Sequence, residues 1–101
     1  MQPNIAIPPE KVDGFCRRHR IRRLALFGSV LRPDFTPNSD VDVLVEFDPE
    51  QHVGLFELYE MEQELAQILG VPRIDLNTPD CLSPYFRDKV LAEAQVQYAG
   101  A

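Results

Sequence analysis

The sequence predicts a small α/β domain of the α+β type, in which a mixed sheet is flanked by helices. Segments with apolar residues at helical spacing alternate with short runs rich in valine, leucine and isoleucine, as expected of alternating helices and strands. The link between the first two predicted strands is too short for a crossover helix, so a wholly parallel sheet is not expected. The 101 residues, 45% of them hydrophobic, are enough for one domain that spans residues 1–101.

The first two elements are a helix and a strand. A helix is predicted over residues 8–20, because prolines at its start favour helix initiation and Val12, Phe15 and Cys16 follow helical spacing. The apolar residues 21–27 then predict a strand that ends at a glycine. A turn of helix is expected over residues 29–32, where the serine that opens it is a good N-cap.

Residues 40–47 predict a second strand with two different faces. Val41, Val43 and Val45 alternate with polar positions, so they can be buried together. Asp40 and Asp42 project from the opposite face. Two carboxylates so close on one face repel each other unless a cation lies between them.

The clearest helix is predicted over residues 54–69. One stripe of the helix is expected to face the core, and it consists of Leu55, Leu58, Glu62, Leu65 and Leu69, widened by Tyr59, Met61 and Ile68. The residues expected to face outward are Glu57, Glu60 and Glu64. Gly70 is a candidate C-cap, and Pro72 prevents the helix from continuing. A short third strand follows over residues 73–77. A last helix is expected after the Ser83-Pro84 start signal, with residues 96–98 as a final strand or a tail.

The charge is −6 and unevenly distributed: seven of the ten Lys and Arg lie in residues 1–32, whereas residues 33–72 hold none and ten Asp and Glu. Such a chain is a poor general nucleic-acid binder, since phosphates require cationic side chains. One basic cluster stands out, and it is compatible with either a solvated helix end or a contact with a partner or phosphate. Its members are Arg17, Arg18, His19, Arg20, Arg22 and Arg23.

Cys16 falls on the apolar face of the first helix, and neither it nor Cys81 has metal-binding spacing. No signal peptide and no apolar run of membrane-spanning length is apparent, so a cytoplasmic protein is expected.

The main motif is Gly28-Ser29, ten further residues, and then Asp40-Val41-Asp42. Glycine allows a close backbone approach, and the N–H groups at a helix start attract phosphate. Paired carboxylates without nearby sulfur or nitrogen ligands suit Mg²⁺, which leaves coordination sites for substrate phosphates. The alternative is a surface hairpin in which Asn38 and Ser39 are turn residues and Asp42 is solvated.

This spaced motif resembles the signature of the minimal nucleotidyltransferases, and residues 73–91 match that family too. The resemblance implies a polymerase-beta-like nucleotidyltransferase fold. It implies catalytic and metal-binding roles, with two Mg²⁺ ions, for Asp40, Asp42 and Asp75, and ATP-binding roles for Gly28, Ser29, Arg32 and Ser39. Many relatives have glycine where this chain has Pro33, which bears on the nucleotide contacts of that loop. A different possibility for Asp75 is a surface ion pair with Arg73.

Small proteins of this type resemble the antitoxin half of HEPN–MNT pairs. That likeness implies Mg²⁺-dependent transfer of AMP from ATP to a tyrosine of a HEPN ribonuclease toxin, which would be the protein partner. Two alternatives remain open: an antitoxin that acts by binding alone, with an inactive site, and a transferase subunit that modifies a small molecule such as an aminoglycoside.

Overall fold

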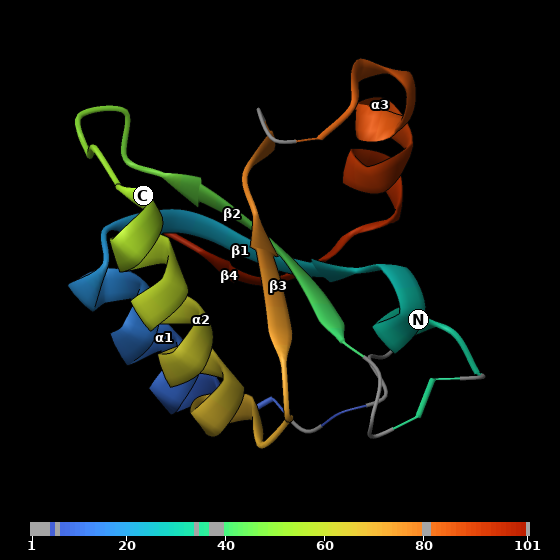
Figure 1. Cartoon of the computed structure of the whole chain (residues 1–101), viewed down its shortest axis with the longest axis horizontal. Coiled ribbons are helices and arrows are strands. Elements are labelled where there is room, and N and C mark those ends of the chain that lie inside the picture. The colour runs from blue at the N-terminus through green and yellow to red at the C-terminus, as the bar shows by residue number, and fades with distance from the viewer. Residues whose placement is uncertain (1–4, 6, 34, 37–39, 80–81, 101) are drawn as a thin grey trace.

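A computed structural model describes residues 5, 7–33, 35–36, 40–79 and 82–100 of the chain. It consists of one four-stranded mixed sheet, two helices that cover one face of it, and a third helix set apart (Figure 1). The elements in chain order are α1 (Pro9–Arg18), β1 (Ile21–Phe27), the short 3-10 helix η1 (Gly28–Leu31), β2 (Val41–Phe47), α2 (Leu55–Leu69), β3 (Ile74–Asn77), α3 (Pro84–Glu93) and β4 (Gln95–Ala99). The predicted fold class and every predicted helix and strand are confirmed, with small shifts at the ends.

The strand order is β3-β2-β1-β4. β1 pairs antiparallel with β2 and with β4, whereas β2 and β3 are parallel. The mixed sheet follows from the connections: α2 is long enough to carry the chain back for a parallel strand, but the link from β1 to β2 is not. The final segment, expected as strand or tail, forms the edge strand β4.

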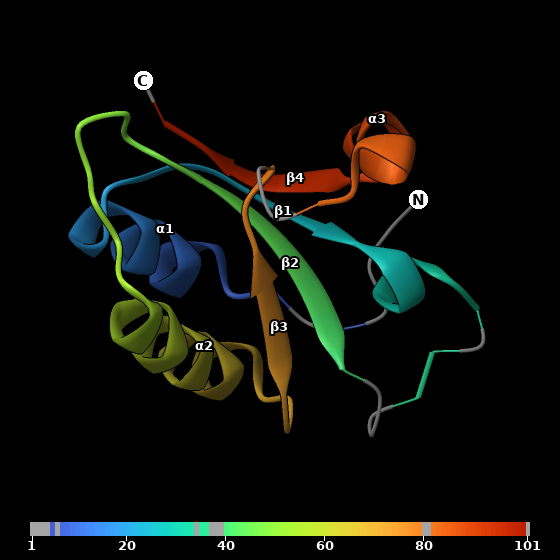
Figure 2. The same cartoon turned by 45° about the horizontal axis from the view of Figure 1, so that its top comes forward.

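The core lies between the sheet and the pair α1 and α2, which run side by side in both views (Figures 1 and 2). Val41, Val43 and Val45 of β2 are fully buried there, as the alternation predicts. Their partners on the helices are all apolar, and they include Val12, Phe15, Cys16, Met61, Leu65, Ala66 and Leu69. Among the described residues, no helix is long and apolar enough to cross a membrane.

One expectation about a side chain at the junction of α1 and α2 is wrong. Glu64 is expected to face solvent, but it is only partly exposed and pairs with Arg18 at the end of α1 and with His19, which follows it. His19 Nε2 lies 3.1 Å from a Glu64 oxygen, and its ring packs 4.7 Å from the ring of Phe15. Helical spacing places Glu64 on the flank of α2, and only the packing of α1 beside it supplies cations there. Arg18 and His19, two members of the basic cluster, therefore form contacts within the domain.

The apolar stripe of α2 begins later than expected. Leu55 and Tyr59 are exposed rather than buried, and the buried positions start with Met61. The spacing of a helix identifies its apolar face but not the turn at which that face first meets the sheet. At the other end, Gly70 adopts a left-handed conformation (φ 68°) and ends the helix, as predicted.

α3 stands beyond the end of the sheet, on the side of η1 (Figure 2). The expected capping of its start is confirmed, because the Tyr85 amide donates a 3.4 Å hydrogen bond to the Ser83 hydroxyl. The helix then leads directly into β4, and this return brings its last residues close to η1.

Candidate active site

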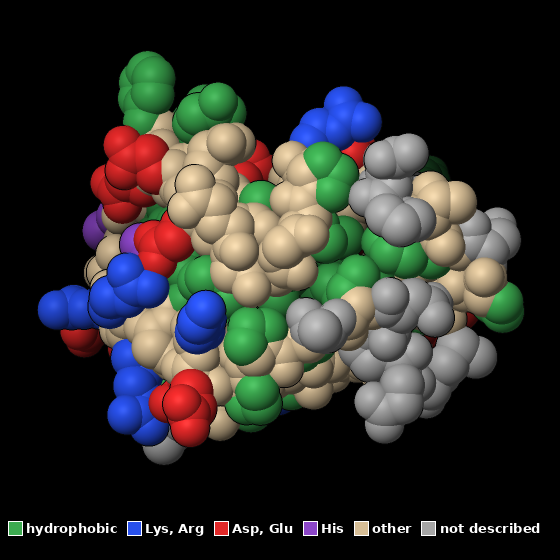
Figure 3. Space-filling view, turned by 90° about the horizontal axis from the view of Figure 1, so that it is seen from below, with side chains coloured by type: hydrophobic (Ala, Val, Ile, Leu, Met, Phe, Trp, Pro, Cys, Tyr) green, Lys and Arg blue, Asp and Glu red, His purple; other side chains and the backbone are tan. Residues whose placement is uncertain are grey.

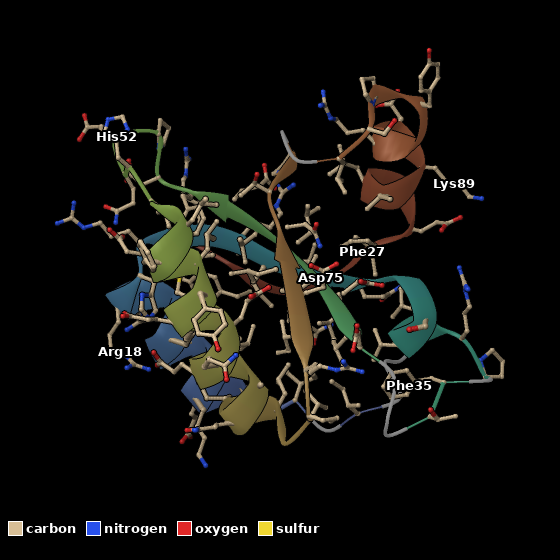
Figure 4. The ribbon with its side chains drawn as sticks, in the orientation of Figure 1. Arg18, Phe27, Phe35, His52, Asp75 and Lys89 are labelled. Carbon is tan, nitrogen blue, oxygen red and sulfur yellow. The ribbon has the colours of Figure 1, made fainter. Side chains whose placement is uncertain are left out.

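The parallel pairing of β2 with β3 places two carboxylates beside each other. Asp42 is the register partner of Asp75 on the neighbouring strand. Both alternate with the buried valines and leucines of their strands, so they project from the face of the sheet that α1 and α2 leave uncovered. Figure 4 shows Asp75 on this side, near Phe27, which is paired with Asp42 from β1. Two residues far apart in the sequence are thus joined in one site.

Gly28 closes this site from the end of β1. Its φ is +76°, a conformation that L side chains rarely adopt. A Cβ atom at this position would also collide with Oδ2 of Asp42. Glycine is therefore required for two reasons, and it brings the start of η1 directly against the carboxylate.

Ser29 belongs to η1 but does not cap it, contrary to the expectation from sequence. The 3-10 helix starts one residue earlier, after Phe27, and no side chain caps it. The Ser29 hydroxyl instead donates a 3.4 Å hydrogen bond to the backbone carbonyl oxygen of Asp40. This bond joins the two halves of the motif, which are separated by ten residues in the chain.

Asp40 lies just before β2 and forms an ion pair with Arg73, with Nε 2.9 Å from Oδ1. The sequence left open an ion pair between Arg73 and Asp75, but in the structure Arg73 pairs with Asp40. The adjacent backbone is also joined, because the Val41 amide donates to the Arg73 carbonyl oxygen at 3.2 Å. Both side chains of the pair are more than half exposed, so its contribution to stability is small.

The electrostatics of the site centre on Asp42. Partial burial raises the pKa of its carboxyl, the neighbouring charges of Asp75 and Asp40 raise it further, and Arg32 opposes the shift. Arg32 therefore acts on the same carboxylate. The ionised form of Asp42 is disfavoured in the free protein, and a bound cation would relieve the repulsion.

The donor set fits a hard divalent cation in type, although its three carboxylates are not already grouped around one point. Asp40, Asp42 and Asp75 offer only carboxylate oxygens, the ligands that Mg²⁺ prefers. Within the described part of the chain, however, no three His, Cys, Asp or Glu side chains are grouped closely enough to hold a metal. Asp40 would have to leave Arg73 to join the other two. Ser39, predicted to bind ATP, lies outside the described residues.

A cleft of about 260 Å³ lies between η1 and the junction of α3 with β4, and Gly28, which lies against Asp42, is part of its lining. Its lining includes Gly28 and Arg32, two of the residues predicted to bind ATP, and also Glu93 and Gln95, which the sequence analysis did not single out. No sequence signal marks those two, since only the return of α3 and β4 brings them there. A larger hollow of about 430 Å³ lies between α1 and α2, away from the carboxylates, so size alone does not identify the site.

The family model of the nucleotidyltransferase domain matches residues 9–96, and the chain belongs to that family. A candidate protein adenylyltransferase of Methanocaldococcus jannaschii is 32% identical over 90% of this chain and 95% of its own length. The protein adenylyltransferase MntA of Thermococcus cleftensis is 36% identical over 75% of this chain and 74% of its own length. The predicted family is therefore confirmed, and the chain is a nucleotidyltransferase.

Solved structures agree with the fold. One candidate minimal nucleotidyltransferase has 36% identity and a TM-score of 0.68, and the match covers 85% of each chain. A second structure is a complex of the tri-AMPylated Shewanella oneidensis HEPN toxin with an MNT antitoxin. It matches at 19% identity and a TM-score of 0.59, over 90% of this chain and 69% of the other. At that identity the second match shows a shared fold and nothing more.

Proposed function

We propose that this protein is a Mg²⁺-dependent protein adenylyltransferase that transfers AMP from ATP to a tyrosine of a HEPN toxin and thereby acts as an antitoxin. The observation that carries the proposal is the pairing of Asp42 with Asp75 directly against the Gly28 backbone. Burial, followed by the neighbouring charges of Asp75 and Asp40, raises the pKa of the Asp42 carboxyl, and such perturbed carboxylates are typical of active sites.

In this proposal each site residue has a defined task. Asp42 and Asp75, joined by Asp40 once it leaves Arg73, would hold the Mg²⁺. The bound ion supplies Lewis-acid activation of the attacking hydroxyl and charge neutralisation of the leaving pyrophosphate. Gly28, Ser29, Arg32 and Ser39 would hold the triphosphate, and Asp75 would accept the proton of the attacking tyrosine. Positioning and charge stabilisation provide most of the catalysis in such transfers.

The acceptor is inferred from the relatives rather than from the site geometry. Two similar proteins carry the name of protein adenylyltransferases, one of them a candidate, and a structural neighbour is bound to a HEPN toxin that carries AMP. The cleft of about 260 Å³ is at the small end for ligand sites, which agrees with a site that holds part of a nucleotide while the acceptor comes from another protein.

The test is co-expression with the product of the neighbouring gene, the candidate HEPN partner, followed by intact-mass measurement of both. We expect an AMP-sized mass increment on the partner with the wild-type chain and none with Asp42→Asn or Asp75→Asn. Asp88→Asn is the matched control, because it removes an exposed carboxylate of α3 and should leave the increment intact. Peptide mapping then locates the acceptor side chain. An increment that persists in Asp42→Asn would refute the proposed site.

One observation favours a second function, neutralisation by binding alone. Asp40 is held by Arg73, and the described carboxylates form no ready group of three. The same experiment separates the two functions: a stable complex without any mass change, and equal neutralisation by Asp42→Asn, would support binding alone.

A further inference from the structure

The first turn of α2 exposes a compact group of large hydrophobic side chains. Leu55 is 84% exposed, Phe56 88% and Tyr59 61%, and together they define the α2 patch. The core of the domain does not need them, because the inward face of the helix is supplied by residues from Leu58 onward. Figure 3 shows hydrophobic side chains that protrude beside acidic ones at this edge of the molecule.

The α2 patch differs from scattered surface apolar residues. Its three members are contiguous and two are aromatic, the residue type that is enriched in interface centres. Farther along the same outward face the helix becomes polar at Gln63 and Gln67, which are exposed as well. The apolar character is therefore confined to one turn, the extent expected of an anchoring point.

The charged residues around the α2 patch indicate which charge a protein that binds there must carry. Glu57 and Glu60 are exposed within the same turns, and residues 33–72 contain no Lys or Arg. A second copy of this chain, with its net charge of −6, would bring like charges together. By contrast, a partner protein with an apolar recess and a rim of Lys and Arg is complementary to the α2 patch in both hydrophobicity and charge.

We propose that the α2 patch is the docking surface for the protein acceptor, and that this acceptor presents such a basic, apolar recess. The inference rests on the proposed function and adds the place of recognition to it. β2 leads from Asp42 to Phe47, and α2 begins after the following loop, so the patch lies at the far end of that strand from the carboxylates. In Figure 4, His52 in this loop lies across the molecule from η1. The patch thus anchors the acceptor without taking part in the chemistry.

The test uses a triple variant, Leu55→Ser, Phe56→Ser and Tyr59→Ser, with the product of the neighbouring gene, the candidate HEPN partner, as the probe. Calorimetric titration should show at least a roughly 30-fold weaker Kd, the size expected for loss of aromatic anchors. The KM for that protein should rise to a similar extent while kcat stays the same. Transfer to a short tyrosine peptide of the same protein should not change. Because all three side chains are exposed, folding should be unaffected, which circular dichroism verifies.

Two controls isolate the patch. The double variant Gln63→Ser with Gln67→Ser alters the same face one turn later. The variant Tyr85→Ser removes a different exposed aromatic side chain, which lies on α3. Both control proteins should bind the partner like the wild type. Glu57→Lys with Glu60→Lys should slow association and remove its salt dependence.

Other outcomes overturn the inference in distinguishable ways. If the triple variant binds and modifies the partner like the wild type, the α2 patch is not the docking surface, whereas the proposed function stands. If the wild type neither binds nor modifies the HEPN protein, both are wrong. A wild-type dimer in sedimentation that the triple variant converts to monomer would make a second copy the occupant.

Discussion

The position of Asp42 in the fold distinguishes it from the other acidic residues of the candidate site. It is one of three candidate ligands, yet it alone is partly buried, faces Asp75 across the strand pair and is covered by the Gly28 backbone. Burial, followed by the charges of Asp75 and Asp40, raises the pKa of its carboxyl. The resulting repulsion is a cost to the free protein that a bound cation would remove.

Asp42→Asn should therefore stabilise the fold while it abolishes transfer. A raised pKa in the folded state means that ionised Asp42 destabilises the protein at pH values above that pKa. This cost falls as the pH is lowered through the folded pKa toward the ordinary value of 3.8. Thermal denaturation at several pH values should show a Tm advantage of a few degrees for the variant at pH 7. The advantage should disappear near pH 4, and a lower Tm at pH 7 would contradict this account.

At the scale of elements, α2 has two tasks in the fold, and both begin at Leu58. From this residue onward the helix covers the sheet, and it carries the chain back so that β3 can lie parallel to β2. Glu62 adds a direct link, because its carboxylate accepts a 2.8 Å hydrogen bond from the Leu76 amide of β3. That bond helps to hold the strand that carries Asp75. The first turn contributes little to either task.

Two leucines of the same helix should therefore respond very differently to truncation. Leu65 is fully buried, so Leu65→Ala should cost about 2–5 kcal/mol of the free energy of unfolding. Leu55→Ala should change it by less than about 0.5 kcal/mol, because Leu55 is exposed. Urea denaturation of both variants measures the difference, and comparable losses would show that the first turn packs against the domain.

At the scale of the whole molecule, the sheet topology creates the site. The antiparallel β1–β2 pair brings Gly28 to Asp42, the parallel β2–β3 pair brings Asp75, and the return of α3 into β4 brings Glu93. The core valines of β2 lie on the opposite face, so one face of the sheet packs against the helices and the other carries the candidate site residues. A ligand at this face should be coupled to the stability of the fold as a whole.

Divalent cations should accordingly stabilise the wild-type chain. A ligand at a hundred times its Kd adds about 2.7 kcal/mol, and each kcal/mol shifts Tm by roughly 4–8 °C for a domain of this size. We expect Mg²⁺ or Mn²⁺ to raise the Tm of the wild type and of Asp88→Asn, but not that of Asp42→Asn. Equal shifts in all three proteins would place the cation elsewhere.

Much of the fold could be predicted because local patterns and core packing agree. The alternation of β2, the apolar run of β1 and the start and stop signals of the helices are each decided by neighbouring residues. The exceptions are contacts between distant elements. The spacing predicts Leu55 in the core and Glu64 in solvent, and it does not predict the pairing of Arg73 with Asp40, because spacing gives the face of an element but not its neighbour.

By itself, the sequence determined the mixed α/β class, the Gly28-Ser29 and Asp40-Val41-Asp42 motif and the family that carries it. These features depend on residues that are adjacent or at fixed spacing. The tertiary structure alone decided that Asp42 faces Asp75, that Arg73 holds Asp40 and that Glu93 lines the cleft. The register between strands and the packing of α3 set these contacts. Both depend on the free energy of the whole chain, which local sequence patterns do not reveal.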